Sequence, residues 1–250
     1  MREYPRYIRI CADAVSDDTF FKGFRQARGY HKVVEGVPEE LGGKYVSYIK
    51  DHYSYLLSHM EIFATNDLVG NPKMYYYEDL GREISSVTCR YIKILGDMIE
   101  LFDTLDNLDI VEIGAGYGGQ CKIIHDYCKP RSYTIVDLPE AGKLAKKYLK
   151  YFGINSVKFK TPDSIFNEKY SLCISNYAFA EFDRKYQDFY AENIIKKSDK
   201  GYMVCNFFGK YTIKEKPDRF TQQEICDLKP TGKVFPEDPV SAECNFLYVW

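Results

Sequence analysis

Apolar residues recur every three or four positions in two stretches of the first hundred residues. The first stretch comprises Val46, Ile49, Tyr53, Leu57, Met60 and Phe63, and the second comprises Ile84, Val87, Tyr91, Leu95, Met98 and Phe102. This period places the apolar side chains on one face of a helix. We therefore expect two amphipathic helices, each with one face to bury.

A turn separates these two helical stretches. Gly70, Asn71 and Pro72 interrupt the apolar period, as residues that favour turns do. The tyrosines that follow would then lie over a neighbouring surface. Tyr75 and Tyr76 are therefore candidates for aromatic contact with a substrate.

From Asp109 onward the pattern changes to short apolar runs that alternate with helical stretches. The expected strands are DIVEI, SYTIV, VKFK, SLCIS, YMVCN and the terminal NFLYVW. Such alternation predicts a mostly parallel α/β sheet covered on both faces. The turn-rich segment 231–243 before the last strand favours a closing antiparallel hairpin. The polar residues 103–109 suggest a helical cap over 1–105 and an α/β domain over 106–250.

Composition narrows the class of protein. The chain has 250 residues, of which 45% are hydrophobic and 28% charged, as in a globular protein with a core. Its net charge of -2 disfavours nucleic acid as a partner. The N-terminus lacks the apolar core of a signal peptide, and no apolar run approaches the roughly 20 residues of a membrane span. We expect a cytoplasmic protein whose eight cysteines, none in a CxxC pair, are free thiols without zinc.

The stretch VEIGAGYGGQ, residues 111–120, contains a glycine-rich loop that is a candidate cofactor-binding site. Gly114, Gly116 and Gly119 follow a strand with GxGxxG spacing, which two cofactor classes could explain. Dinucleotide sites favour a small residue where Lys122 stands and an apolar residue where Glu112 stands. S-adenosylmethionine has no pyrophosphate, and a carboxylate at the strand end could hold its amino-acid end.

Acidic residues follow the second and third strands. Asp137 lies 25 residues beyond Glu112, close to the spacing of about 20 at which an acid binds ribose hydroxyls. The alternative is a favourable charge before Pro139 at a helix N-terminus. Asp163 and Ser164 stand where the adenine edge would lie. Asp163 could accept a hydrogen bond from the exocyclic amine or could cap a turn.

The blocks VEIGAGYGGQ, SYTIVDLPE and ISNYAFAEF, with the upstream GNP and TCRYI, together resemble the sugar O-methyltransferases. This is a Rossmann-like class I methyltransferase family of surface-polysaccharide gene clusters and some large viruses. The resemblance runs from about Gly70 to the C-terminus. It implies S-adenosylmethionine as methyl donor and a sugar hydroxyl of a glycan or glycoconjugate as acceptor. It implies a cofactor site formed by Glu112, Gly114, Ala115, Gly116, Asp137, Leu138, Asp163, Ser164, Asn176 and Tyr177.

Methyl transfer to a hydroxyl benefits from a base at the end of the fourth strand. Glu181 is the first candidate and Asp183 the second, although Glu181 could instead be a first-turn acid of the next helix. His59, seven residues after His52 on the same expected helix, is a further candidate. His125 is better explained as a structural or surface histidine.

The remaining candidates concern substrate contacts and metal. Tyr177 is well located to face the sulfonium or the sugar ring. Arg90 could pair with the cofactor carboxylate or an anionic sugar, or could be a helix-surface charge. Ser175 and Asn176 end the fourth strand where a Mg²⁺ site would want acids, so we expect no metal. A nicotinamide-dependent oxidoreductase and a non-catalytic cofactor-binding module stay open as alternatives.

Overall fold

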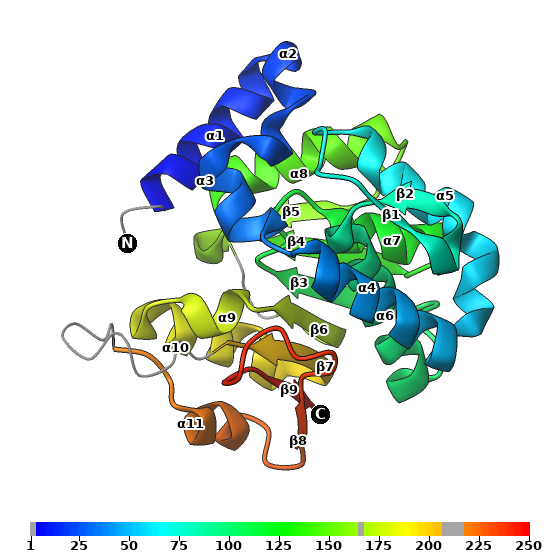
Figure 1. The fold of residues 1–250 in the computed structure, drawn as a ribbon. Coiled ribbons are helices and arrows are strands. Elements are labelled where there is room, and N and C mark those ends of the chain that lie inside the picture. Colours follow the sequence, from blue (N-terminus) through cyan, green and yellow to red (C-terminus); the bar gives the residue numbers. More distant parts are fainter. Residues whose placement is uncertain (1–3, 165–167, 207–217) are drawn as a thin grey trace. The chain divides into compact units, whose positions relative to one another are not determined.

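The computed structural model describes residues 4–164, 168–206 and 218–250, which form two compact units (Figure 1). The first unit comprises Met1–Asp106, Gly116–Lys129 and Leu138–Asn155. The second comprises Asn107–Ala115, Pro130–Asp137 and Ser156–Trp250. Both units are therefore discontinuous in sequence, and the first break between them follows Asp106. The functional division into a cap and a cofactor domain stays a prediction.

The first unit is mainly helical. Its main helices are α1 (Tyr4–Ser16), α2 (Asp18–Phe21), α3 (Arg28–Tyr30), α4 (Glu39–His52), α5 (Met60–Ala64), α6 (Ser86–Phe102), α7 (Gly119–Tyr127) and α8 (Pro139–Tyr151). Strands β1 (Tyr75–Tyr77) and β2 (Arg82–Ile84) form a short antiparallel hairpin that the sequence did not predict. No helix in the described part of the chain has both the length and the apolar composition needed to cross a bilayer.

The helix expected over residues 46–63 is interrupted, and that prediction is wrong. Helix α4 ends at His52, a 3₁₀ segment spans Ser54–His59, and α5 begins at Met60. Tyr53 leaves the helical conformation, with φ −125° and ψ 38°, and its hydroxyl donates a 2.7 Å hydrogen bond to Asp97. This long-range contact overrides the local period. His52 and His59 consequently do not share one helix.

Helix α6 confirms the second expected helix. Its N-cap Ser85 accepts a 3.1 Å hydrogen bond from the backbone N–H of Thr88, which satisfies one of the exposed donors of the first turn. The predicted turn before the hairpin is also present. Gly70 and Asn71 both have positive φ, 86° and 50°.

A buried ion network links distant segments of the first unit. The guanidinium of Arg25 is fully buried and donates to both carboxylate oxygens of Glu35, at 2.8 and 3.0 Å, and to Asp67 at 3.1 Å. It also lies 4.6 Å from the ring centroid of Tyr117, in the glycine loop. The planar, permanently charged fork of arginine suits such a site. Arg25 therefore links the N-terminal segment to Tyr117, the residue that follows Gly116 in the glycine loop.

The second unit contains a seven-stranded sheet in order β5-β4-β3-β6-β7-β9-β8. The strands are β3 (Asp109–Ile113), β4 (Ser132–Val136), β5 (Lys158–Lys160), β6 (Tyr170–Asn176), β7 (Ser198–Cys205), β8 (Lys233–Pro236) and β9 (Phe246–Val249). Strands β3 to β7 pair in parallel, whereas β9 is antiparallel to both β7 and β8. The mostly parallel sheet and the closing antiparallel hairpin are confirmed.

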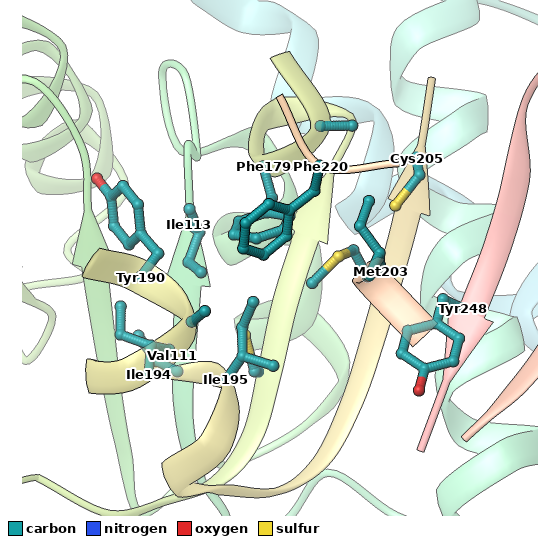
Figure 2. Close-up of a cluster of buried hydrophobic side chains, with 14 of the residues drawn as sticks. Val111, Ile113, Phe179, Tyr190, Ile194, Ile195, Met203, Cys205, Phe220 and Tyr248 are labelled. Atoms are coloured by element: carbon teal, nitrogen blue, oxygen red, sulfur yellow. The ribbon is translucent and has the colours of Figure 1, made fainter. Parts of the chain in front are cut away.

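One core of the second unit lies between this sheet and the helices after β6 (Figure 2). Those helices are α9 (Ala178–Glu181), α10 (Arg184–Asn193) and α11 (Gln222–Asp227). Figure 2 labels Val111, Ile113, Phe179, Tyr190, Ile194, Ile195, Met203, Cys205, Phe220 and Tyr248. Gln187 of α10 links this helix to its neighbours, because its side-chain amide donates a hydrogen bond to Phe179 O of α9 and accepts one from Phe220 N. All eight cysteines are free, as expected.

Candidate active site

The carboxyl ends of β3, β4 and β6 bring several predicted site residues to one edge of the second unit. Glu112 pairs in register with Ile135 of β4 and with Ile174 of β6. Gly114, Asp137 and Asn176 therefore lie at the same edge of three adjacent parallel strands. Ligands of open α/β sheets bind outside this edge.

Gly114 meets a steric requirement at this edge. Its φ is 73°, and its N–H donates a 3.0 Å hydrogen bond to Val136 O. A Cβ at this position would lie 2.2 Å from the Cβ of Ala178. The close approach of α9 and the left-handed backbone both demand glycine.

Glu112 is a buried carboxylate with an altered affinity for protons. It is 2% exposed, and the Tyr133 hydroxyl donates a 2.7 Å hydrogen bond to its Oε2. Burial raises the pKa of Glu112 to about 7 and repulsion from Asp137 adds to the rise, while the Tyr133 hydrogen bond opposes it. The carboxylates of Glu112 and Asp137 therefore repel each other electrostatically, and Glu112 changes protonation near neutral pH.

The end of β6 contains an amide without a partner. The side-chain oxygen and nitrogen of Asn176 are both buried, and neither has a hydrogen-bond partner among the described residues. Buried polar atoms in folded proteins are nearly always paired, so such a group indicates a place for a ligand or water. Asn176 thus offers one acceptor and two donor positions at the sheet edge.

Tyr177 adopts a strained backbone directly after Asn176. Its φ of 68° and ψ of −22° lie in the left-handed region, and its N–H donates a 2.8 Å hydrogen bond to Val204 O. Its hydroxyl donates to Glu237, a buried carboxylate that also accepts hydrogen bonds from Ser241 and Asn245. Strain of this kind is concentrated at functional sites.

Hydrogen bonds fix the segment that contains the predicted bases Glu181 and Asp183. Ser175 Oγ donates to Ile113 O and accepts a 3.1 Å hydrogen bond from Phe179 N, which anchors the start of α9 to β3. Glu181 ends α9 and accepts a 2.6 Å hydrogen bond from the Asn206 amide, just after β7. Because α10 begins only at Arg184, Glu181 is not a first-turn acid of that helix, and this alternative is wrong.

Asp183 and the two adenine candidates lie in simpler surroundings. Asp183 is the N-cap residue of α10, although its side chain makes no capping hydrogen bond. Asp163 and Ser164 are exposed in a 3₁₀ turn. Ser164 Oγ donates to Thr161 O at 2.9 Å and accepts from Thr161 N at 3.0 Å. Ser164 thus caps this turn, and the adenine contacts of both residues stay predictions.

Several predicted site residues belong to the first unit. Gly116 has φ 60°, and Leu138 is the N-cap residue of α8. The His59 ring packs edge-on against Tyr127, with centroids 4.8 Å apart. Arg90 Nη2 donates a 3.3 Å hydrogen bond to a backbone carbonyl, that of residue 34. Their roles toward cofactor, base and substrate stay predictions.

The first unit also contains a cavity of about 380 Å³ to which Tyr75 contributes. His31, Glu35 and Lys73 line it together with Tyr75, so charged, aromatic and hydroxyl groups all face this cavity. Tyr76 is 57% exposed and is not among the lining residues. Of the two tyrosines predicted to contact substrate, only Tyr75 lines this cavity.

Sequence reasoning missed the partners of the predicted residues. Tyr133, Asn206 and Glu237 each bond a candidate side chain, yet each lies more than 20 residues from it in the chain. Only the strand alternation of SYTIV could have placed Tyr133 on the same face as Glu112. No group of three or more His, Cys, Asp or Glu side chains in the described ranges is arranged to hold a metal ion.

The comparisons with known proteins concern the fold. No protein-family model matches the chain, and no curated protein does. Solved structures that resemble part of it include PhzM, a pyocyanin biosynthetic protein (12% identity, TM-score 0.46, 66% of this chain and 55% of that one). A second is the N-terminal domain of EvdMO1 in the presence of SAH and D-fucose (11% identity, TM-score 0.48, 64% of this chain and 81% of that one). A third is the methyltransferase domain of bacterial CtHen1-CN (11% identity, TM-score 0.46, 64% of this chain and 96% of that one).

The strand order itself identifies the fold class. The dinucleotide-binding order 3-2-1-4-5-6 continues in parallel to its last strand. Here the last strand instead enters antiparallel between β7 and β8. The chain spans only about half the length of PhzM, so the likeness covers a part of that protein. The second unit contains a Rossmann-like α/β sheet that is mostly parallel and has an antiparallel C-terminal strand.

Proposed function

We propose that the protein is an S-adenosylmethionine-dependent O-methyltransferase that methylates a sugar hydroxyl of a glycan or glycoconjugate. One observation carries the proposal: the bare backbone of Gly114, the carboxylate of Asp137 and the unpartnered amide of Asn176 meet at one sheet edge. Fold alone does not imply function, so the proposal depends on these groups.

The edge residues fit the chemistry of the cofactor. Asp137 is an acceptor for ribose hydroxyls, and the Asn176 amide supplies the donor and acceptor that adenosine or the methionine portion requires. Gly114 keeps side chains out of the crevice. When bound, the cofactor supplies an electrophilic methyl group on a sulfonium. The site needs no strong positive field, because the ligand has no pyrophosphate.

Glu181 is the proposed base. Its Oε1 is held by the Asn206 amide, so the side chain has a fixed direction while the second carboxylate oxygen can accept a proton. A positioned base of this kind accelerates attack by roughly 10²–10⁴-fold. Asp183 and His59 are the second and third candidates.

The acceptor is the finer part of the proposal. The resemblance to sugar O-methyltransferases supports a sugar hydroxyl. A cavity that combines an aromatic ring with hydroxyl and charged groups is also of the kind that binds small polar ligands, and Tyr75 provides that ring. Arg90 would serve an anionic acceptor or the cofactor carboxylate. We also propose that the reaction takes place in the cytoplasm.

Replacing Glu181 with Gln tests the proposal. Mass gain on a panel of methyl-free glycans should fall by at least about 100-fold in Glu181→Gln, while the affinity for S-adenosylmethionine in calorimetry stays within about twofold. Glu192→Gln, an exposed acid on α10, is the matched control and should keep full turnover.

Three outcomes would contradict parts of the proposal. Wild-type protein that binds NAD but not S-adenosylmethionine would indicate an oxidoreductase. Cofactor binding without turnover on any acceptor would favour a non-catalytic module. Unchanged turnover in Glu181→Gln would reject Glu181 as the base.

A further inference from the structure

Asn206 follows β7 directly, and only one arm of its side-chain amide is accounted for. The Nδ2 arm donates the 2.6 Å hydrogen bond to Glu181 Oε1. The Oδ1 arm is buried and has no hydrogen-bond partner among the described residues. Because buried polar atoms in folded proteins are nearly always paired, this oxygen indicates a place for a ligand group or a water.

The carboxylate of Glu181 fixes which way this amide faces. An ionised carboxylate only accepts hydrogen bonds, so the NH₂ arm of Asn206 must face it and Oδ1 must be the free arm. Packing holds both residues in place, since Ala180 and Cys205 directly precede them in the chain and are buried in one hydrophobic cluster. The Asn206 oxygen is therefore an acceptor with a fixed position beside the proposed base.

Glu181 and Asn206 together present two acceptors side by side. The amide engages Oε1 of Glu181, which leaves Oε2 for the attacking hydroxyl. One amide group separates this carboxylate from the Asn206 oxygen, and neither acceptor can donate a hydrogen bond. Two hydroxyls on neighbouring carbons of a sugar ring offer two O–H donors that are similarly close together. Both residues belong to the second unit, so this arrangement lies within one unit.

We propose that Asn206 Oδ1 accepts a hydrogen bond from a second hydroxyl of the acceptor, on the carbon next to the one that bears the attacking hydroxyl. The acceptor class is thus a vicinal diol. This inference rests on the proposed function and names a specificity-determining residue for it. Glu181 takes the proton of the attacking hydroxyl, whose oxygen bonds the methyl carbon as the carbon–sulfur bond breaks. The second hydroxyl is not methylated; it orients the ring for that attack.

Competition between a diol and its deoxy analogue tests this hydrogen bond. The probes are the methyl pyranosides of glucose, galactose, mannose, xylose and rhamnose, together with the derivatives of each that lack a single ring hydroxyl. Each sugar is mixed with an equal amount of one derivative, and mass spectrometry of the methylated products gives the ratio of the two kcat/KM values, whatever the total turnover. In wild type, loss of one hydroxyl beside the methylated position should lower kcat/KM by at least about tenfold, because a buried acceptor is then left unpaired.

Three variants separate contact with the substrate from positioning of the base. Asn206→Ala removes both arms of the amide, so turnover falls and the preference for the diol shrinks to less than about twofold. Asn206→Asp keeps an acceptor oxygen but sets a second acid against Glu181, so turnover falls while a preference of at least about fivefold remains. Asn193→Ala is the matched control; it removes an amide that bonds only within α10, to Phe189 O, and should keep the wild-type turnover and preference.

The results that overturn the inference are specific. Wild type that does not distinguish the diols from any deoxy analogue rejects it and leaves the proposed function intact. Lower turnover with an unchanged preference in Asn206→Ala also rejects it, because Asn206 would then only position Glu181. Loss of the preference in Asn206→Asp rejects it too, since the retained oxygen would have no effect; if Asn206→Ala forms no product, this ratio and that of wild type decide. Wild type that methylates none of these sugars rejects the sugar-hydroxyl part of the proposed function, and this inference with it.

Discussion

Replacing Glu112 with Gln should make the protein more stable at alkaline pH but not at acidic pH. Glutamine preserves the size of the side chain and an oxygen that can accept the hydrogen bond from Tyr133. It removes the charge that burial disfavours. Moving the carboxyl pKa from 4.5 to about 7 corresponds to about 3 kcal/mol against the ionised form. Domains of ordinary stability unfold with only about 5–15 kcal/mol, so the effect should be easy to measure.

The pH window follows from the direction of this pKa change. The folded protein holds the Glu112 proton more tightly than the unfolded chain, so between pH 4.5 and about 7 the folded state binds more protons. This residue therefore lowers the free energy of unfolding progressively as pH rises through that window, and its effect is constant above it. Wild type and Glu112→Gln should unfold alike near pH 4.5 and differ by up to about 3 kcal/mol at pH 8.

Urea unfolding of both proteins, followed by circular dichroism at pH 4.5, 6 and 8, measures the difference. Comparing the two proteins at each pH cancels the titration of other groups. A difference that does not change with pH would refute the argument, because it would mean that the Glu112 carboxylate is hydrated in the folded state. A less stable Glu112→Gln at pH 8 would show that the ionised carboxylate makes favourable contacts that outweigh its burial.

Three further substitutions test other parts of the structure. Gly114→Ala should cost at least about 2 kcal/mol in thermal unfolding, because it adds a left-handed alanine and a clash with Ala178. Arg25→Met should cost about 3–5 kcal/mol in urea unfolding, because it leaves buried carboxylates without their partner. Glu237→Gln should lower the thermal midpoint and kcat together, because it replaces an acceptor of several hydrogen bonds, including the one from Tyr177.

Matched comparisons make these outcomes decisive. Arg131→Met breaks a more exposed pair with Asp109 and should cost much less than Arg25→Met, so an equal cost for the two substitutions would contradict the buried network. Combining Gly114→Ala with Ala178→Gly should recover part of the loss; no recovery would place the clash elsewhere. A Glu237→Gln protein with normal kcat would mean that the Tyr177 position does not depend on this carboxylate.

The sheet was predictable because buried parallel strands are short continuous apolar runs that local sequence reveals. The closing hairpin was predictable too, since the turn-rich segment before Phe246 left no room for a crossover helix. The break after α4 was not, because it depends on the bond between Tyr53 and Asp97, 44 residues apart. Strands of three residues, such as Tyr75–Tyr77, are too short to show a period.

The candidate site likewise has features that the sequence predicts and features that it does not. Residues at strand ends, such as Asp137 and Asn176, could be predicted because chain order fixes which strand each follows. Their surroundings could not be predicted, since the orphaned amide of Asn176 and the unpaired oxygen of Asn206 depend on what the finished fold leaves unpaired. The buried Arg25 lies in short irregular helices without an apolar period, so its sequence neighbourhood looks like ordinary surface.

The interleaving of the two units limits how this protein can be cut and recombined. The chain crosses from one unit to the other at five points, so no single cleavage releases either unit whole. Exchange of residues 1–105 between homologous proteins would leave α8 behind, although Lys147 of that helix donates to Ala14 O and Val15 O of α1. Chimeras that exchange the N-terminal segment should therefore carry α7 and α8 along with it.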